Sequence, residues 1–90
     1  MTYFTIRLTV ADYAKWRPIF DADGSRRLAG GATGVQSVYR DLANPNDITM
    51  LFEWDNLESA QRFLQDPALA ENMQLSGVVS APEIRFLTLA

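Results

Sequence analysis

The residues that could do chemistry in this 90-residue chain are limited, because it contains no histidine and no cysteine. Proton transfer would fall to Asp, Glu, Tyr, Lys or Arg, with a pKa moved by burial or by a charged neighbour. Disulfides, thiolate nucleophiles and Cys-ligated metal centres are excluded. No carboxylates cluster at ligand spacing, so we expect no metal site.

One candidate set is charged. Strand alternation predicts Arg7, Glu53 and Arg85 on one face of a sheet, in adjacent strands. Two guanidinium groups could there bracket a carboxylate or a substrate oxyanion. The simpler interpretation, which we favour, is a structural row of ion pairs at a dimer contact, because buried charges must be paired.

A second candidate set is aromatic: Tyr13, Trp16, Tyr39 and Trp54. We expect these side chains between the sheet and the helices, where they could stack on a planar aromatic ligand. Aromatic residues at such spacings more often form plain core. An enclosed pocket of at least a few hundred Å3 with Tyr39 or Trp54 in its wall would favour the ligand site.

The stretch AGGATG, residues 29–34, is glycine-rich but follows a predicted helix and precedes a strand. A phosphate cradle needs the reverse order, so we interpret it as a helix C-cap and turn. Arg26 and Arg27 stand just before it. We interpret them as a solvated pair that interacts with the helix dipole.

Alternation from Tyr3 to Val10 predicts the first strand, with Phe4, Ile6, Leu8 and Val10 on the inner face. Asp12 is placed to cap a helix whose apolar stripe holds Tyr13, Trp16, Phe20 and Leu28. Pro18 should loosen or kink this helix and leave its first turn separate. Gly30 and Gly31 should end it.

The rest of the chain predicts a hairpin, a broken helix and a strand. Strands over Val35–Leu42 and Ile48–Trp54 flank an Asn44–Asp47 turn. Asp55 and Glu58 have capping-box spacing, and Asp66-Pro67 restarts the second helix until Gly77. Its expected inward side chains are Leu57, Ala60, Phe63, Leu64, Leu69 and Met73, and the last strand is expected over Glu83–Leu89.

The order βαββαβ favours an α+β, ferredoxin-like fold: residues 1–90 as a single domain, strand order 4-1-3-2, helices on one face. The other face mixes apolar and charged residues: Thr5, Arg7, Leu51, Glu53, Arg85, Leu87 and Leu89. With 48% hydrophobic residues in so short a chain, this mixture favours a homodimer formed through the sheet face.

Net charge of −3 and the lack of a basic run argue against a nucleic-acid partner. No apolar run approaches a membrane span, and the N-terminal residues do not resemble a signal peptide. We therefore expect a soluble, cytoplasmic protein without a membrane partner.

Three segments carry a resemblance to a known superfamily: VADYAKWRPIFD, GVQSVYRD followed by NPNDITMLFEWDNLESAQRFL, and DPALAENMQLSGVVSAPEIRFL. They resemble the dimeric α/β-barrel proteins, specifically small proteins described as antibiotic-biosynthesis-monooxygenase-like or cyclase-like. The resemblance implies two ferredoxin-like sheets paired into a barrel. Its members include cofactor-free monooxygenases, polyketide cyclases, lactone isomerases, haem-degrading enzymes and non-catalytic stress proteins.

The lack of histidine departs from the haem-degrading branch and from several cyclases. The nearest remaining type is a cofactor-free oxygenase or cyclase, whose phenolic substrate supplies much of the reactivity, so we expect no cofactor. Two hypotheses follow: an enzyme that oxygenates, cyclises or isomerises a small aromatic or polyketide-like molecule, and a non-catalytic dimeric module that binds a small hydrophobic ligand or is purely structural.

Overall fold

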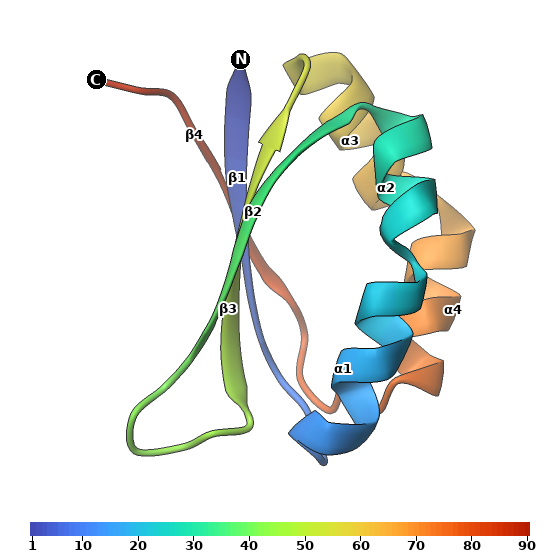
Figure 1. Cartoon of the computed structure of the whole chain (residues 1–90), viewed down its shortest axis with the longest axis vertical. Helices are drawn as coiled ribbons and strands as arrows, with labels where there is room; N and C mark the ends of the chain where they lie inside the picture. The colour runs from blue at the N-terminus through green and yellow to red at the C-terminus, as the bar shows by residue number, and fades with distance from the viewer.

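The computed structural model describes all residues, 1–90, and consists of a four-stranded antiparallel sheet with helices on one face (Figure 1). The strand order β2-β3-β1-β4 confirms the predicted order 4-1-3-2 and the ferredoxin-like fold. The helices all fall short of the length and apolar character that a membrane-spanning helix needs. The elements are β1 (Thr2–Thr9), α1 (Tyr13–Ala22), α2 (Gly24–Gly30), β2 (Ala32–Arg40), β3 (Asp47–Trp54), α3 (Leu57–Gln65), α4 (Pro67–Leu75) and β4 (Glu83–Leu87).

The two central strands supply most of the core, as their alternation predicts. Every second residue of β1 and β3 points toward the helices and is buried, because a strand turns successive side chains to opposite faces. Each large apolar side chain that is fully buried contributes about 1.5–3 kcal/mol. These residues are Phe4, Ile6, Leu8, Ile48, Met50, Phe52 and Trp54, with Val10 just beyond β1.

The first helical segment breaks at Asp23, not near Pro18. Asp12 caps α1 as predicted, its Oδ1 accepting from the Ala14 N–H at 3.0 Å. Pro18 stays inside a continuous α1, so the expected separate first turn is wrong. Pro18 and Ala14 are exposed, and water can solvate the carbonyl that loses its N–H partner.

Of two further predictions about this segment, one is confirmed and one is wrong. Gly31, with φ of 123°, ends α2 as expected. Leu28 is 57% exposed, so its place on the apolar stripe is wrong. Arg27 is buried instead, because it follows Phe20 by seven residues, two full turns, and so stays on the inner side of the helix.

The second helical segment breaks at Asp66-Pro67 as predicted, with the Asp66 carboxylate accepting from Ala68 N at 2.9 Å. The predicted cap at Asp55 is wrong: Asn56 caps α3 by accepting from Ser59 N at 2.8 Å. Ala60 and Phe63 are buried.

Leu57 is 45% exposed, against expectation, because the first residue of α3 projects from its outer end. Strand ends also differ from the predicted ones. β2 starts three residues early, across a register shift between Ala32 and Gln36, and β4 ends at Leu87.

Candidate functional site

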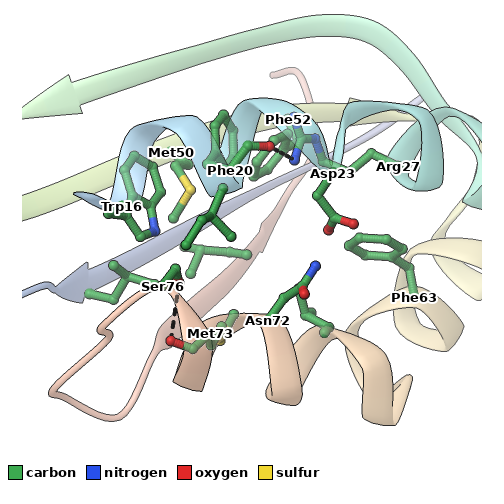
Figure 2. A pocket seen from close by; sticks show the side chains of 14 residues that line it. Trp16, Phe20, Asp23, Arg27, Met50, Phe52, Phe63, Asn72, Met73 and Ser76 are labelled. Atoms are coloured by element: carbon green, nitrogen blue, oxygen red, sulfur yellow. Dashed lines mark hydrogen bonds between the residues drawn. The ribbon is translucent and has the colours of Figure 1, made fainter. Parts of the chain in front are cut away.

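A cavity of about 50 Å3 lies between the sheet and the helices α1, α2 and α4 (Figure 2). Aromatic rings form much of its wall, and Asp23, Arg27 and Asn72 gather at one end, whereas Ser76 lies nearer Trp16 at the other. The lining aromatic residues are Trp16, Phe20, Phe52 and Phe63; the methionines are Met50 and Met73; the polar residues are Asp23, Arg27, Asn72 and Ser76; and the aliphatic residues are Ile6, Leu8, Ile19 and Leu69.

The cavity is smaller than predicted. A volume of about 50 Å3 holds a few water molecules, whereas a benzene-sized guest occupies roughly 150 Å3. Neither Tyr39 nor Trp54 lies in its wall. Tyr39 borders an open depression of about 370 Å3 on the outer sheet face, which is not enclosed. The expectation of an enclosed pocket of at least a few hundred Å3 beside Tyr39 or Trp54 is therefore wrong, and a ring-sized ligand between sheet and helices requires part of the wall to move.

The aromatic wall contains one stacked pair, with tilted rings on either side of it. The rings of Trp16 and Phe20 are 4.8 Å apart and 21° from parallel. Phe20 in turn lies 6.1 Å from Phe52, and Tyr13 extends the row at 5.8 Å from Trp16. Such a row offers flat apolar surface of the kind that planar rings pack against.

Arg27 is the buried cation of the site, with only 6% of its surface exposed. Its Nη1 donates to the Phe20 carbonyl oxygen at 2.9 Å, and its Cζ lies 4.0 Å above the Phe20 ring. Its Nε is buried without a hydrogen-bond partner, and no carboxylate lies within 4.0 Å of the guanidinium. Burial lowers the Arg27 pKa, an effect that the charges of Asp23 and Asp21 partly offset.

Asp23 lies beside Arg27 at the polar end, but its charge is matched by another arginine. Arg26 donates to both Asp23 carboxylate oxygens at 2.8 Å. This pairing holds the Asp23 pKa below its ordinary value against the effect of burial, with help from the Asn72 amide. In Figure 2 the Asp23 carboxylate and the Asn72 amide face each other across the end of the cavity. Asp23 is consequently ionised and a weak base.

The predicted charged set does not come together. In the antiparallel register Arg7 lies opposite Thr49, while Glu53 lies opposite Tyr3, four residues away along β1. Arg85 lies opposite Thr5 and forms no ion pair. All three residues are on the outer sheet face, but no carboxylate is bracketed by two guanidinium groups.

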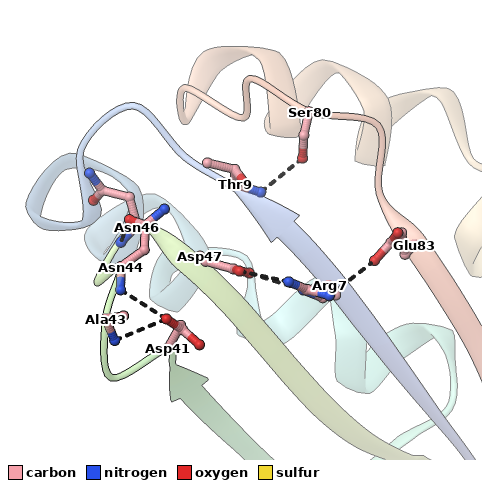
Figure 3. A network of polar contacts seen from close by, with 9 residues as sticks. All are labelled: Arg7, Thr9, Asp41, Ala43, Asn44, Asn46, Asp47, Ser80 and Glu83. Atoms are coloured by element: carbon pink, nitrogen blue, oxygen red, sulfur yellow. Dashed lines mark hydrogen bonds and ion pairs between the residues drawn. The ribbon is translucent and has the colours of Figure 1, made fainter.

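Each carboxylate of the outer face has other partners. Arg7 pairs with Asp47 at 2.9 Å and reaches Glu83 at 3.8 Å (Figure 3). The Arg7 hydrogen bond lowers the Asp47 pKa. Glu53 accepts from Thr33 Oγ1 at 2.8 Å, and the hydrogen bonds of Thr33 and Tyr3 lower its pKa. Arg7 with Asp47 and Glu83 forms a row of ion pairs, but Glu53 and Arg85 of the predicted set take no part in it.

The predicted aromatic set is divided among three locations. Trp16 lines the cavity, and Tyr13 packs beside it under the Arg40 guanidinium, whose Cζ is 3.8 Å from the ring. Trp54 is fully buried, and its Nε1 donates to the Gly30 carbonyl oxygen at 3.0 Å. Tyr39 is 57% exposed on the outer face, so its expected inner position is wrong.

Sequence reasoning missed Asp23, Arg27 and Asn72 as cavity residues. The solvated position expected for Arg27 is wrong, although its seven-residue spacing from Phe20 was a usable signal. Asn72 precedes Met73 and follows Leu69 by three residues on α4, so helical periodicity also places it beside the predicted inner side.

Similar structures identify the class of fold that this sheet and its helices form. No protein-family model matches the chain, and no curated protein matches it. Among solved structures, SnoaB, a cofactor-independent oxygenase from Streptomyces nogalater, superimposes with a TM-score of 0.77 at 18% identity over 99% of this chain and 92% of that one. A proposed antibiotic biosynthesis monooxygenase from Bordetella bronchiseptica gives 0.82 at 14% identity, over 99% and 96%.

A conserved protein from Methanosarcina mazei Go1 gives a TM-score of 0.73 at 20% identity, over 96% of this chain and 89% of that one. The chain therefore has the fold of the antibiotic biosynthesis monooxygenases, which confirms the resemblance seen in its sequence. At these identities the likeness defines the fold, and function has to be argued from the site.

Proposed function

We propose that this protein is a cofactor-independent monooxygenase that binds a small planar aromatic or polyketide-like molecule between its sheet and its helices. The observation that carries the proposal is the cavity with its aromatic stack of Trp16 and Phe20, in a fold shared with a cofactor-independent oxygenase. Stacked rings favour a flat ligand, and the polar end at Asp23 and Arg27 fixes one orientation.

The chemistry balances if the substrate is the reductant. A hydroxylated ring system with an activated CH2 group reacts with O2 so that the CH2 becomes a carbonyl and the second oxygen atom leaves as water. The carbon gives up four electrons, which is what O2 requires. The protein then has to hold the substrate, exclude water and stabilise charge on the substrate oxygen.

Helix α4 is the wall that moves to admit a ligand. It contributes Leu69, Asn72 and Met73 to the cavity, and Ser76 follows at its C-terminal cap, yet none of the residues of α4 itself is fully buried. Breaks at Asp66 and Gly77 bound it on both sides. A flexible methionine on each side of the cavity, Met50 and Met73, adapts readily to a guest.

The proposed working form is a homodimer joined through the outer sheet face. Leu51 is only partly covered on this face, and Leu87 is 41% exposed. Exposed Arg85 and the Arg7 ion pairs surround them with charge, a mixture typical of a protein contact with a polar margin.

Oxygen uptake tests the enzymatic proposal. Metal-stripped protein is mixed with hydroxylated anthrones and naphthalenes, and O2 consumption is followed together with product mass. A gain of one oxygen atom and loss of two hydrogen atoms, dependent on protein, is expected. A product formed without O2 consumption and without a gained oxygen atom would contradict oxygenation. It would indicate cyclisation or isomerisation instead.

Matched variants locate the reaction in the cavity. Leu69→Trp fills the cavity from α4, whereas Ala70→Trp adds the same side chain at the neighbouring exposed position. Turnover should be lost in the first variant and kept in the second. Equal turnover in both, with unchanged circular dichroism, would contradict a site between sheet and helices.

A non-catalytic binding module is the second candidate. The observation that favours it is the Asp23 pKa, which is lowered, whereas a catalytic base needs a pKa raised toward neutrality. Ligand binding without turnover of any bound aromatic compound would favour this role.

A further inference from the structure

One buried cation at the polar end of the cavity, Arg27, has no direct counter-ion. Asp23 is neutralised by its two contacts with Arg26, at 2.8 Å each, and Asp21 is paired with Arg17 at 3.0 Å. Arg27 remains without an ion pair, although it is more than nine-tenths buried. Arg26 also reaches Asp66 at 3.5 Å, so the nearby charges balance in number, and Arg27 is the buried cation that has no carboxylate in direct contact.

Arg27 also retains unused hydrogen-bonding capacity. Its Nη1 is taken by the Phe20 carbonyl oxygen, but its Nε is buried and has no partner. A buried donor without an acceptor, on a buried cation without a counter-ion, is unfavourable for the protein alone. A ligand oxygen with negative charge would relieve both conditions.

We propose that Arg27 is the binding residue for an ionised oxygen of the ligand, so that the substrate class is planar aromatic molecules carrying a carboxylate, phenolate or enolate. The inference rests on the proposed function only in assuming that a planar ring enters the cavity. The ring packs on the wall of Trp16 and Phe20, and its ionised oxygen lies at the Arg27 end. A planar guanidinium suits such an oxyanion better than an ammonium group would.

The test compares ligands that differ only in charge. Binding of 2-naphthoate and of neutral 2-naphthamide is measured by titration calorimetry, with 2-naphthol and 2-methoxynaphthalene as a second pair. Wild-type protein should bind naphthoate at least about tenfold more tightly than the amide, since one charge-assisted hydrogen bond is worth that much. A preference for naphthol over its methyl ether that grows at alkaline pH would identify a phenolate in place of a carboxylate.

The variants are Arg27→Met and Arg27→Gln, with Arg62→Gln as the control, because Arg62 is an exposed arginine whose nearest carboxylate is 3.9 Å away. Both Arg27 variants should bind charged and neutral ligands equally, and the control should keep the wild-type preference. If Arg27→Met does not fold, Arg27→Gln carries the comparison.

Equal binding of charged and neutral ligands by wild-type protein would overturn the Arg27 proposal and leave the aromatic site intact. Retention of the preference in a folded Arg27 variant would overturn it as well. Failure of every planar aromatic compound to bind wild-type protein would instead remove the proposed function.

Discussion

Arg27 covers the Phe20 ring with its guanidinium, Cζ to centroid 4.0 Å, and donates from Nη1 to the carbonyl oxygen of the same residue at 2.9 Å. Phe20 thus gives Arg27 a π face and one acceptor, but no negative charge. This relationship makes Arg27 a buried cation held by stacking, and it suggests a distinctive response to mutation.

Arg27→Met should leave the free energy of unfolding unchanged or raise it by about 1–4 kcal/mol, because an unpaired buried charge gives way to an apolar side chain of similar length. The Phe20 carbonyl keeps a donor, the Asp23 N–H at 3.2 Å. Urea unfolding measures the change. Arg27→Ala, which also removes the side-chain stem, should cost about 2–4 kcal/mol. A comparable loss in Arg27→Met would assign Arg27 a purely structural role.

The lowered pKa of Asp23 should make the free energy of unfolding depend on pH in the acid range. Its folded-state pKa lies below the ordinary 3.8, mainly because of Arg26. Between the two pKa values the unfolded chain binds a proton that the folded chain does not, so stability rises with pH there. The contribution is complete above the unfolded pKa and is lost as pH falls through the folded value.

Urea unfolding of wild type and Asp23→Asn across this acid range should therefore show a stability difference that shrinks as pH falls below about 4. A difference that stays constant, or grows, on acidification would contradict the pairing of Asp23 with Arg26.

Alanine substitutions at two glycines distinguish the cost of backbone strain from the cost of steric overlap. Gly31 and Gly34 have φ of 123° and 97°, and both should resist a side chain. A Cβ on Gly34 meets nothing closer than 4.0 Å, whereas on Gly31 it would lie 2.6 Å from Asp55 Oδ1 and 2.8 Å from Trp54 Nε1. Gly34→Ala should cost about 1–2 kcal/mol from strain alone.

Gly31→Ala should cost about 1–3 kcal/mol more than Gly34→Ala, because overpacking is added to strain. The midpoints of thermal unfolding measure both. Equal losses would show that the contacts of Asp55 and Trp54 around Gly31 relax without cost.

The proposed homodimer is tested by charge placed on the outer sheet face. Leu87→Asp should reduce the sedimentation mass from about twice 10.1 kDa to 10.1 kDa, because an unpaired carboxylate would be buried at the contact. Leu42→Asp, at a fully exposed position of the β2–β3 turn, is the matched control and should remain dimeric. A wild-type mass of 10.1 kDa at micromolar concentration would refute the dimer.

Period-two alternation was sufficient to predict the sheet, because β1 and β3 bury every second residue, and the capping residues Asp12 and Asp66 were predicted for the same local reason. The β2 boundary was missed, since its pairing with Trp54 crosses a register shift at Ala32. Pairing across strands is long-range information that a single sequence pattern does not hold.

The candidate site was predicted less well than the fold, because hydrophobicity alone does not show which side chains are buried. Arg27 and Leu28 are neighbours, and hydrophobicity placed the wrong one inside. The prediction places Tyr39 on the inner face, whereas Val38 is the residue that packs on the core. Valine and tyrosine are both common in strands, so residue type does not show which of the two faces inward. Arg7 and Glu53 share a face as predicted, but their distance depended on a register that the sequence does not state.

Methionine methyl groups report most directly on whether a planar ligand enters between the sheet and the helices. The chain has three: Met50 and Met73 line the cavity, and Met1 is 73% exposed outside it. In protein with 13C-labelled methionine methyls, addition of 2-naphthoate should shift the signals of Met50 and Met73 by ring currents and leave Met1 in place. Saturable binding that moves Met1 alone, or none of the three, would contradict the site.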